Sequence, residues 1–170
     1  KKVYFPREIL PISASLSGLV NFLISCVIIL LFCLFGGLGV SFHLILLPII
    51  ALLQLILQTG LVLGLSAVNV YVQDTEYIIQ FVINMLFYGT PILYALSQFN
   101  DAGILGKLIQ LNPLTTIMNA YRDGFLYHQW PEMSGLLIVT LFSVVVLIVG
   151  YIIFKKLEKE VYSLYSNKKV

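Results

Sequence analysis

The stretch SASLSGLVNFLISCVIILLFCLF, residues 13–35, contains no Asp, Glu, Lys or Arg. It lies inside a longer run, from Ile9 to Gln73, that lacks all four of these types. Two more charge-free runs follow, from Tyr77 to Asn100 and from Met133 to Phe154. A helix needs about 20 mostly apolar residues to cross the hydrocarbon core of a bilayer. We therefore expect an all-α integral membrane protein that crosses the membrane several times.

The composition of the 170 residues also excludes several classes of function. Charged residues make up 11% of the chain, against about a quarter in an average soluble domain. The net charge is only +2, which gives no reason to expect a nucleic-acid partner. The sequence has no nucleotide-binding glycine loop, no zinc-protease motif and no nucleophile elbow. We expect no enzymatic activity, no cofactor and no metal site, with Cys26 and Cys33 as apolar packing residues.

The longest charge-free run must contain more than one helix. Three glycines between positions 36 and 39, followed by Ser41 and His43, form its only strong break. The other runs are each long enough for one helix. The sequence thus predicts four spans, at about residues 13–35, 44–68, 77–96 and 134–154.

The segment 101–132 between the third and fourth spans has a different character. Its apolar part is confined to residues 108–121 and is broken early by Asn112 and Pro113. A stretch this short is more often re-entrant or interfacial than spanning. We expect two short helices that enter the membrane from one side and are hinged at Asn112–Pro113.

The basic residues predict the orientation. Eight of the ten lie before the first span or after the fourth, namely Lys1, Lys2, Arg7, Lys155, Lys156, Lys159, Lys168 and Lys169. Positive charges near span ends favour the cytoplasmic side. Both termini are therefore expected in the cytoplasm, residues 155–170 as a cytoplasmic tail, and the even number of spans agrees.

The predicted spans contain amides and hydroxyls rather than ionisable groups at mid-depth. Gln54 and Gln58 share one helix face, and so do Gln80 and Asn84. The simpler interpretation is hydrogen bonding between helices, typically worth about 0.6 kcal/mol per contact. The alternative is a neutral polar lining for an uncharged, hydroxyl-rich substrate. The absence of buried charge argues against ion-coupled transport.

Aromatic residues gather at the end of the third span and in the segment after it. Tyr88 and Tyr94 belong to the first group, and Tyr121 and Phe125 to the second. Their ordinary role is an interfacial belt at the level of the lipid headgroups. The other possibility is stacking against the apolar faces of sugars, and the same residues could serve both roles.

Three stretches, in order, resemble the permease subunit of type-2 ATP-binding-cassette exporters, most closely the branch that exports lipid-linked polysaccharides such as O-antigen and teichoic acid. They are VYFPREILP at residues 3–11, NVYVQDT at 69–75 continuing to FYGTPILY at 87–94, and LNPLT at 111–115 followed by AYR at 120–122. Together they extend over nearly the whole chain.

The resemblance implies a function and partners. It implies that residues 1–12 form a cytoplasmic coupling helix whose contacts with the ATPase subunit are Tyr4, Phe5, Pro6, Arg7 and Glu8. It implies a bacterial cytoplasmic (inner) membrane exporter built from two permease copies and two ATPases, with hydrolysis by the ATPase. It also implies a sugar-polymer channel between the permeases, lined by Tyr88, Tyr94, Tyr121 and Phe125, to which we add Gln54 and Gln58.

The chain departs from the family pattern in two places. Members usually have six spans, so four spans that begin at the coupling helix suggest a truncated permease. Gln73 precedes Asp74 where the family commonly has Arg. The alternatives are an exporter permease for a drug or lipid, or a membrane scaffold that transports nothing.

Overall fold

The computed structural model describes residues 8–37, 39, 41–69, 75–90 and 104–167. Every element in these residues is helical, which confirms the all-α prediction. The order is α1 (Ile9–Phe35), η1 (Phe42–Leu46), α2 (Leu47–Asn69), α3 (Thr75–Gly89), α4 (Ile104–Leu111), α5 (Pro113–Arg122), η3 (Asp123–Tyr127) and α6 (Met133–Asn167). The predicted site residues Tyr4, Phe5, Pro6, Arg7 and Tyr94 lie outside the described residues.

Three helical stretches in the described residues are long and apolar enough to cross a membrane. They are α1, the continuous stretch Phe42–Asn69, and Met133–Lys159 of α6. The chain therefore has the build of a multi-pass membrane protein. As described, α3 has only 15 residues, fewer than a span requires. The predicted third span continues to residue 96, outside the described residues, so the four-span arrangement stays a prediction.

The backbone of the turn between α1 and η1 adopts a conformation that favours glycine. Gly37 and Gly39 have φ values of +77° and +73°, in the left-handed region that side chains with a Cβ avoid. Ser41 then begins η1, because its hydroxyl accepts a hydrogen bond from the backbone N–H of His43. The predicted break thus reverses the chain direction between two long helices.

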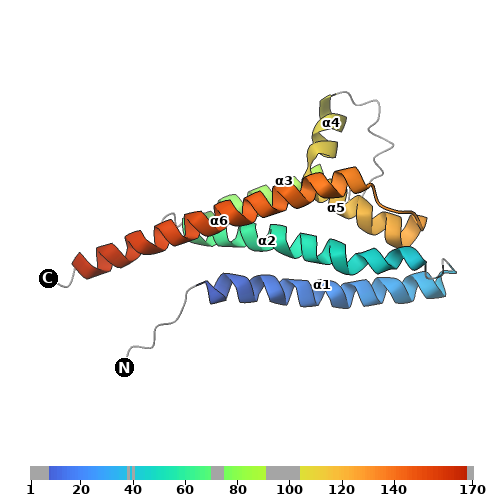
Figure 1. The fold of residues 1–170 in the computed structure, drawn as a ribbon, viewed down its shortest axis with the longest axis horizontal. Coiled ribbons are helices and arrows are strands. Elements are labelled where there is room, and N and C mark those ends of the chain that lie inside the picture. The colour runs from blue at the N-terminus through green and yellow to red at the C-terminus, as the bar shows by residue number, and fades with distance from the viewer. Residues whose placement is uncertain (1–7, 38, 40, 70–74, 91–103, 168–170) are drawn as a thin grey trace.

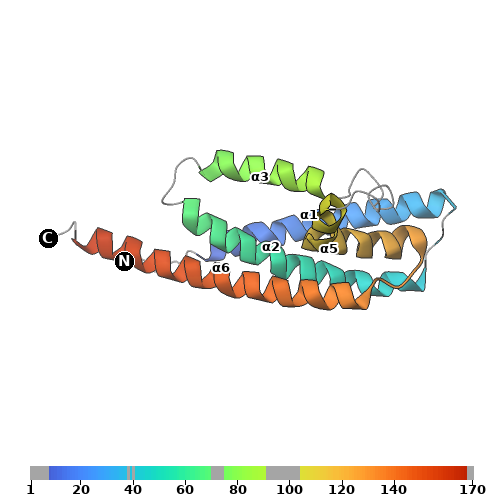
Figure 2. The ribbon, with the colours of Figure 1, turned by 90° about the horizontal axis from the view of Figure 1, so that it is seen from above.

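The closest helix packing joins α2 and α6, which run side by side in both views (Figures 1 and 2). A Cβ added at Gly60 would lie 2.7 Å from Cα of Leu147, and one added at Gly150 would collide with the carbonyl oxygen of Gly60. The two backbones approach so closely because neither glycine carries a side chain. Small residues have the same role where membrane helices associate by van der Waals packing.

The start of α1 and the end of α6 lie at one end of the bundle (Figure 1). The turn before α2, together with α5 and η3, lies at the other end, where His43 and Trp130 rings meet edge to face at 4.8 Å. We call these the open end and the capped end. At the capped end a buried cluster joins α1, α2, α5 and α6. Elsewhere many large apolar side chains are exposed, as expected for surfaces that face lipid.

Candidate functional site

The structure places two of the predicted channel rings in the protein interior. Tyr121 on α5 is 8% exposed and Phe125 in η3 is 6% exposed. The Tyr121 hydroxyl donates a 2.9 Å hydrogen bond to Oε1 of Gln54 on α2, and its ring lies 5.1 Å from that of Phe22. These contacts give Tyr121 and Phe125 a packing role inside one chain, and their place in a channel stays a prediction.

Tyr88 has a different environment. It lies on α3, at the edge of the bundle in Figure 2, and is 71% exposed, with its ring packed edge to face on Phe87. Gln58 is half-buried on α2, close enough to α1 that a Cβ at Gly18 would lie 2.7 Å from its amide nitrogen. The structure therefore joins Tyr121 with Gln54 but distributes the other predicted channel residues over different elements.

The predicted hinge coincides with a break between helices. α4 ends at Leu111 and α5 begins at Pro113, with Asn112 as its N-cap. The Asn112 side-chain oxygen accepts from the N–H of Leu114 at 3.0 Å, and its amide donates to the Thr90 hydroxyl at 3.2 Å. Asn112 therefore fixes the direction of the chain and ties α5 to the end of α3. Movement of the two helices about this point stays a prediction.

Charged side chains cluster at the open end of the bundle. Glu8, the residue before α1, forms an ion pair with Lys155 on α6. Lys155 also lies 3.6 Å from Glu158 and 5.8 Å from the centre of the Tyr151 ring. The one described member of the predicted ATPase-contact set is thus connected to the last helix of its own chain.

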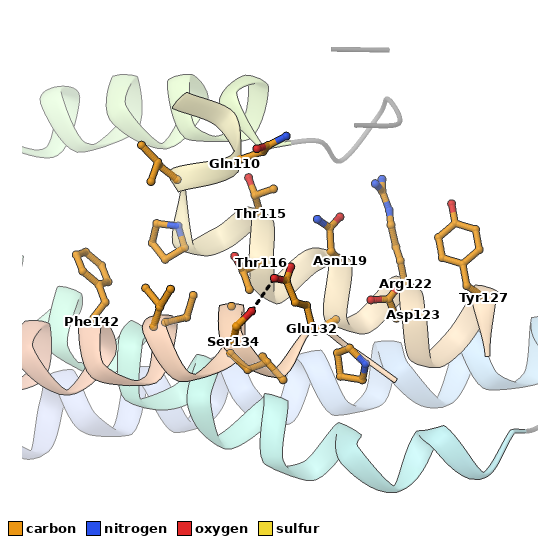
Figure 3. Close-up of a pocket in the computed structure, with 18 residues that line it drawn as sticks. Gln110, Thr115, Thr116, Asn119, Arg122, Asp123, Tyr127, Glu132, Ser134 and Phe142 are labelled. Carbon is orange, nitrogen blue, oxygen red and sulfur yellow. Dashed lines mark hydrogen bonds between the residues drawn. The ribbon is translucent and has the colours of Figure 1, made fainter. Parts of the chain in front are cut away.

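A groove that the sequence analysis did not predict lies at the capped end, between α5 and the start of α6 (Figure 3). Its volume is about 660 Å³. Its walls carry both apolar and polar side chains, and the polar ones are Gln110, Thr115, Thr116, Asn119, Arg122, Asp123, Tyr127, Glu132 and Ser134. Ser134 donates a 2.6 Å hydrogen bond to the Glu132 carboxylate, and burial raises the pKa of the Asp123 carboxyl above its ordinary value.

A helical spacing in the sequence could have revealed this groove. Thr115, Asn119 and Arg122 recur at i, i+4 and i+7, which places polar side chains on one face of α5. Residues 108–121 are largely apolar as a whole, and this average composition hides the polar period. The apolar face of the same helix carries Ile117 and Tyr121, which point into the buried cluster.

Comparison with known proteins gives consistent results. A family model described as ABC-2 type transporter matches residues 2–126. The chain is 31% identical over 159 residues to an O-antigen export system permease protein RfbA of Myxococcus xanthus, covering 94% of this chain and 61% of that protein. Two proteins of the same name from Klebsiella pneumoniae are 30% and 31% identical, with 93% of this chain and 60% of theirs covered. The chain thus spans about three-fifths of the length of these relatives.

Proposed function

We propose, since the chain belongs to the ABC-2 type transporter family, that it forms the membrane-spanning part of an ATP-driven exporter of lipid-linked polysaccharide. The observation that carries the proposal is its 30–31% identity, over more than nine-tenths of its length, to three permeases named for O-antigen export. The resemblance noted in the sequence analysis agrees with this match. In the exporter, the chain supplies a path across the membrane and a separate ATPase subunit supplies the energy.

The proposed arrangement places the open end of the bundle in the cytoplasm. Support comes from the basic residues Lys155, Lys156 and Lys159, which belong to the last turns described for α6. α3 and the residues after it form the third of four spans, and α4 and α5 form a re-entrant pair on the outer side. Two such permeases and two ATPases make the working exporter in the bacterial inner membrane, with both termini in the cytoplasm.

The ion pair between Glu8 and Lys155 suggests how ATP-driven movement reaches the last helix. Residues 4–8 contact the ATPase, and Glu8 is linked to α6 through Lys155. α6 in turn shares its closest packing with α2 through Gly60 and Gly150. A displacement of residues 4–8 is therefore transmitted to α1, α6 and α2 together, rather than to α1 alone.

The polymer passes between the two permease copies. Tyr88, exposed on α3, and Tyr94 contribute aromatic rings to that path. Gln54 and Tyr121 hold its wall together by their mutual hydrogen bond, with Phe125 packed beneath and Gln58 offering an amide between α1 and α2. Amides, hydroxyls and rings suit an uncharged polyol, because each sugar hydroxyl both donates and accepts hydrogen bonds.

An export assay tests the function. The permease containing this chain is expressed with a cassette ATPase in a strain whose own O-antigen permease is deleted, and surface polysaccharide is quantified. Restored surface polymer supports the proposal, and an ATPase variant lacking its nucleotide-binding lysine should abolish it. Association with the ATPase without polymer export would indicate a drug or lipid exporter instead. Failure to co-purify with any cassette ATPase would indicate a scaffold that transports nothing.

A further inference from the structure

The groove between α5 and the start of α6 has the size and the chemistry of a ligand site. Its volume of about 660 Å³ lies within the range of about 300–1,000 Å³ typical of small-molecule pockets. Figure 3 shows Glu132, immediately before α6, and Ser134, in its first turn, reaching towards Thr116 on α5. Gly135 permits this approach, because a Cβ there would lie 3.1 Å from the Thr116 methyl carbon. Polar groups from two elements therefore converge on one space.

Thr115 supplies the most specific sign of a ligand. Its side chain is 2% exposed and lines the groove, yet its hydroxyl has no hydrogen-bond partner among the described residues. Thr59 and Thr140, in contrast, each donate to the carbonyl four residues earlier at 2.7 Å. The break at Asn112 interrupts the helix behind Thr115 and so removes this usual acceptor. A buried hydroxyl without a partner is unfavourable unless something else satisfies it.

The charges of the groove limit what that partner can be. One guanidinium, Arg122, lies among two carboxylates, Asp123 and Glu132. The lining residues that the structure describes carry no positive excess in either protonation state of Asp123, so a phosphate or other anion gains little from them. The side chains of Asn119 and the Thr and Ser hydroxyls can each both donate and accept. This set matches a neutral molecule with several adjacent hydroxyl groups.

Two further features agree with a sugar. Tyr127 and Phe142 contribute rings to the groove wall, where the C–H face of a pyranose can pack. The groove also lies at the capped end of the bundle, opposite Glu8 and Lys155. Under the orientation proposed above, this end faces outward, where the polymer leaves the membrane.

We infer that this groove binds an uncharged, hydroxyl-rich sugar unit of the exported polymer, which forms hydrogen bonds with Thr115 and Asn119 and donates one to the Glu132 carboxylate. The inference rests on the proposed function for the identity of the polymer, but the site itself can be tested by binding alone. It adds to the proposed path a place where the emerging chain is held on the outer side.

The test uses the intact permease in nanodiscs and saturation-transfer NMR with the methyl glycosides of glucose, galactose, mannose and rhamnose. We expect transfer to at least one of them, stronger than to glucose 1-phosphate. Thr115→Val keeps the shape of the side chain and should weaken the binding about two- to tenfold, as Asn119→Ala should, because each removes one hydrogen bond. Thr140→Val makes the same chemical change outside the groove and should leave the binding unchanged.

Three outcomes would overturn the inference: no transfer to any glycoside, equal transfer in the wild type and both groove variants, or preference for the sugar phosphate. A groove that binds lipid headgroups would show this preference for the sugar phosphate. Circular dichroism checks that each variant folds. The export assay separates this inference from the proposed function. Export by a permease that binds no glycoside overturns the site alone, whereas glycoside binding by a permease that exports no polysaccharide contradicts the function alone.

Discussion

Tyr121 and Gln54 are 67 positions apart in the chain, yet the tyrosine hydroxyl donates a 2.9 Å hydrogen bond to the amide oxygen. The bond joins α5 to the first half of α2, and the Tyr121 ring also packs on Phe22 of α1. One side chain thus holds the segment after α4 against two long helices. In an apolar environment such a bond has no competing water, and losing it leaves the amide of Gln54 without this partner.

Replacing Tyr121 with Phe removes this hydrogen bond and keeps the ring. We expect the free energy of unfolding to fall by about 0.6–1.7 kcal/mol, between the average and the largest value found for polar contacts between membrane helices. Unfolding of the purified permease in mixed micelles with increasing SDS measures the change. Tyr77→Phe is the matched control, because Tyr77 on α3 is 78% exposed. Equal losses in the two variants would show that the bond to Gln54 does not contribute to stability.

The crossing of α2 and α6 gives a second prediction. Gly60→Ala would place a methyl group 2.7 Å from Cα and from the backbone nitrogen of Leu147, so the two helices must separate. Overpacking of this kind typically costs about 1–3 kcal/mol. We expect a loss of that size in the same SDS titration, and a similar loss for Gly150→Ala.

Gly64→Ala is the control for this pair of substitutions. A Cβ at Gly64 would lie 3.6 Å from Cα of Gly150, an ordinary van der Waals contact. Alanine is also a better helix former than glycine by about 1 kcal/mol. We expect Gly64→Ala to be neutral or slightly stabilising. If Gly60→Ala and Gly64→Ala behaved alike, the close approach of the two backbones would be contradicted.

Hydropathy and charge were sufficient to predict an all-α protein with several membrane-spanning helices, and the glycines at positions 36–39 were sufficient to predict the turn between the first two of them. They could not predict which aromatic rings are buried, because Tyr88 and Tyr121 both follow apolar stretches in the sequence. One is 71% exposed and the other is buried. The difference arises from contacts with Gln54 and Phe22, which are distant in the chain and have no local signal.

The groove escaped prediction for a different reason. Its polar side chains come from α5 and from the start of α6, and only folding brings them together. The α5 half has a readable helical period at Thr115, Asn119 and Arg122. The other half, Glu132 and Ser134, resembles an ordinary helix start. The missing hydrogen bond of the Thr115 hydroxyl, seen among the residues that the structure describes, depends on the break at Asn112 and cannot be inferred from composition.

The ion pair between Glu8 and Lys155 predicts a charge-swap result in the export assay. Glu8→Lys places two positive charges together, and Lys155→Glu places a negative charge beside Glu158 as well as Glu8. If the pair transmits movement from residues 4–8 to α6, each single variant should export at least about fivefold less polymer than the wild type. The double variant should recover part of the export, because opposite charges face each other again.

Lys156→Glu controls for a general effect of charge at the open end, since it makes the same reversal beside the pair. Surface polysaccharide measures export, and ATPase co-purification shows whether the complex assembles. The partly exposed pair contributes little to stability, so protein levels should stay near those of the wild type. Equal export by the double variant and by the two single variants would argue against coupling through this contact.

The proposed orientation predicts which positions react from outside the cell. Cys26 and Cys33 are buried, and both are first replaced by Ala. In that background, Gln129→Cys at the capped end and Lys159→Cys at the open end each give one exposed thiol. A membrane-impermeant maleimide should label the Gln129 variant in spheroplasts and leave the Lys159 variant unlabelled until the membrane is opened, because the positive end of the bundle lies in the cytoplasm. Labelling of Lys159→Cys in intact spheroplasts would reverse the orientation, and it would place the groove on the side from which the polymer enters.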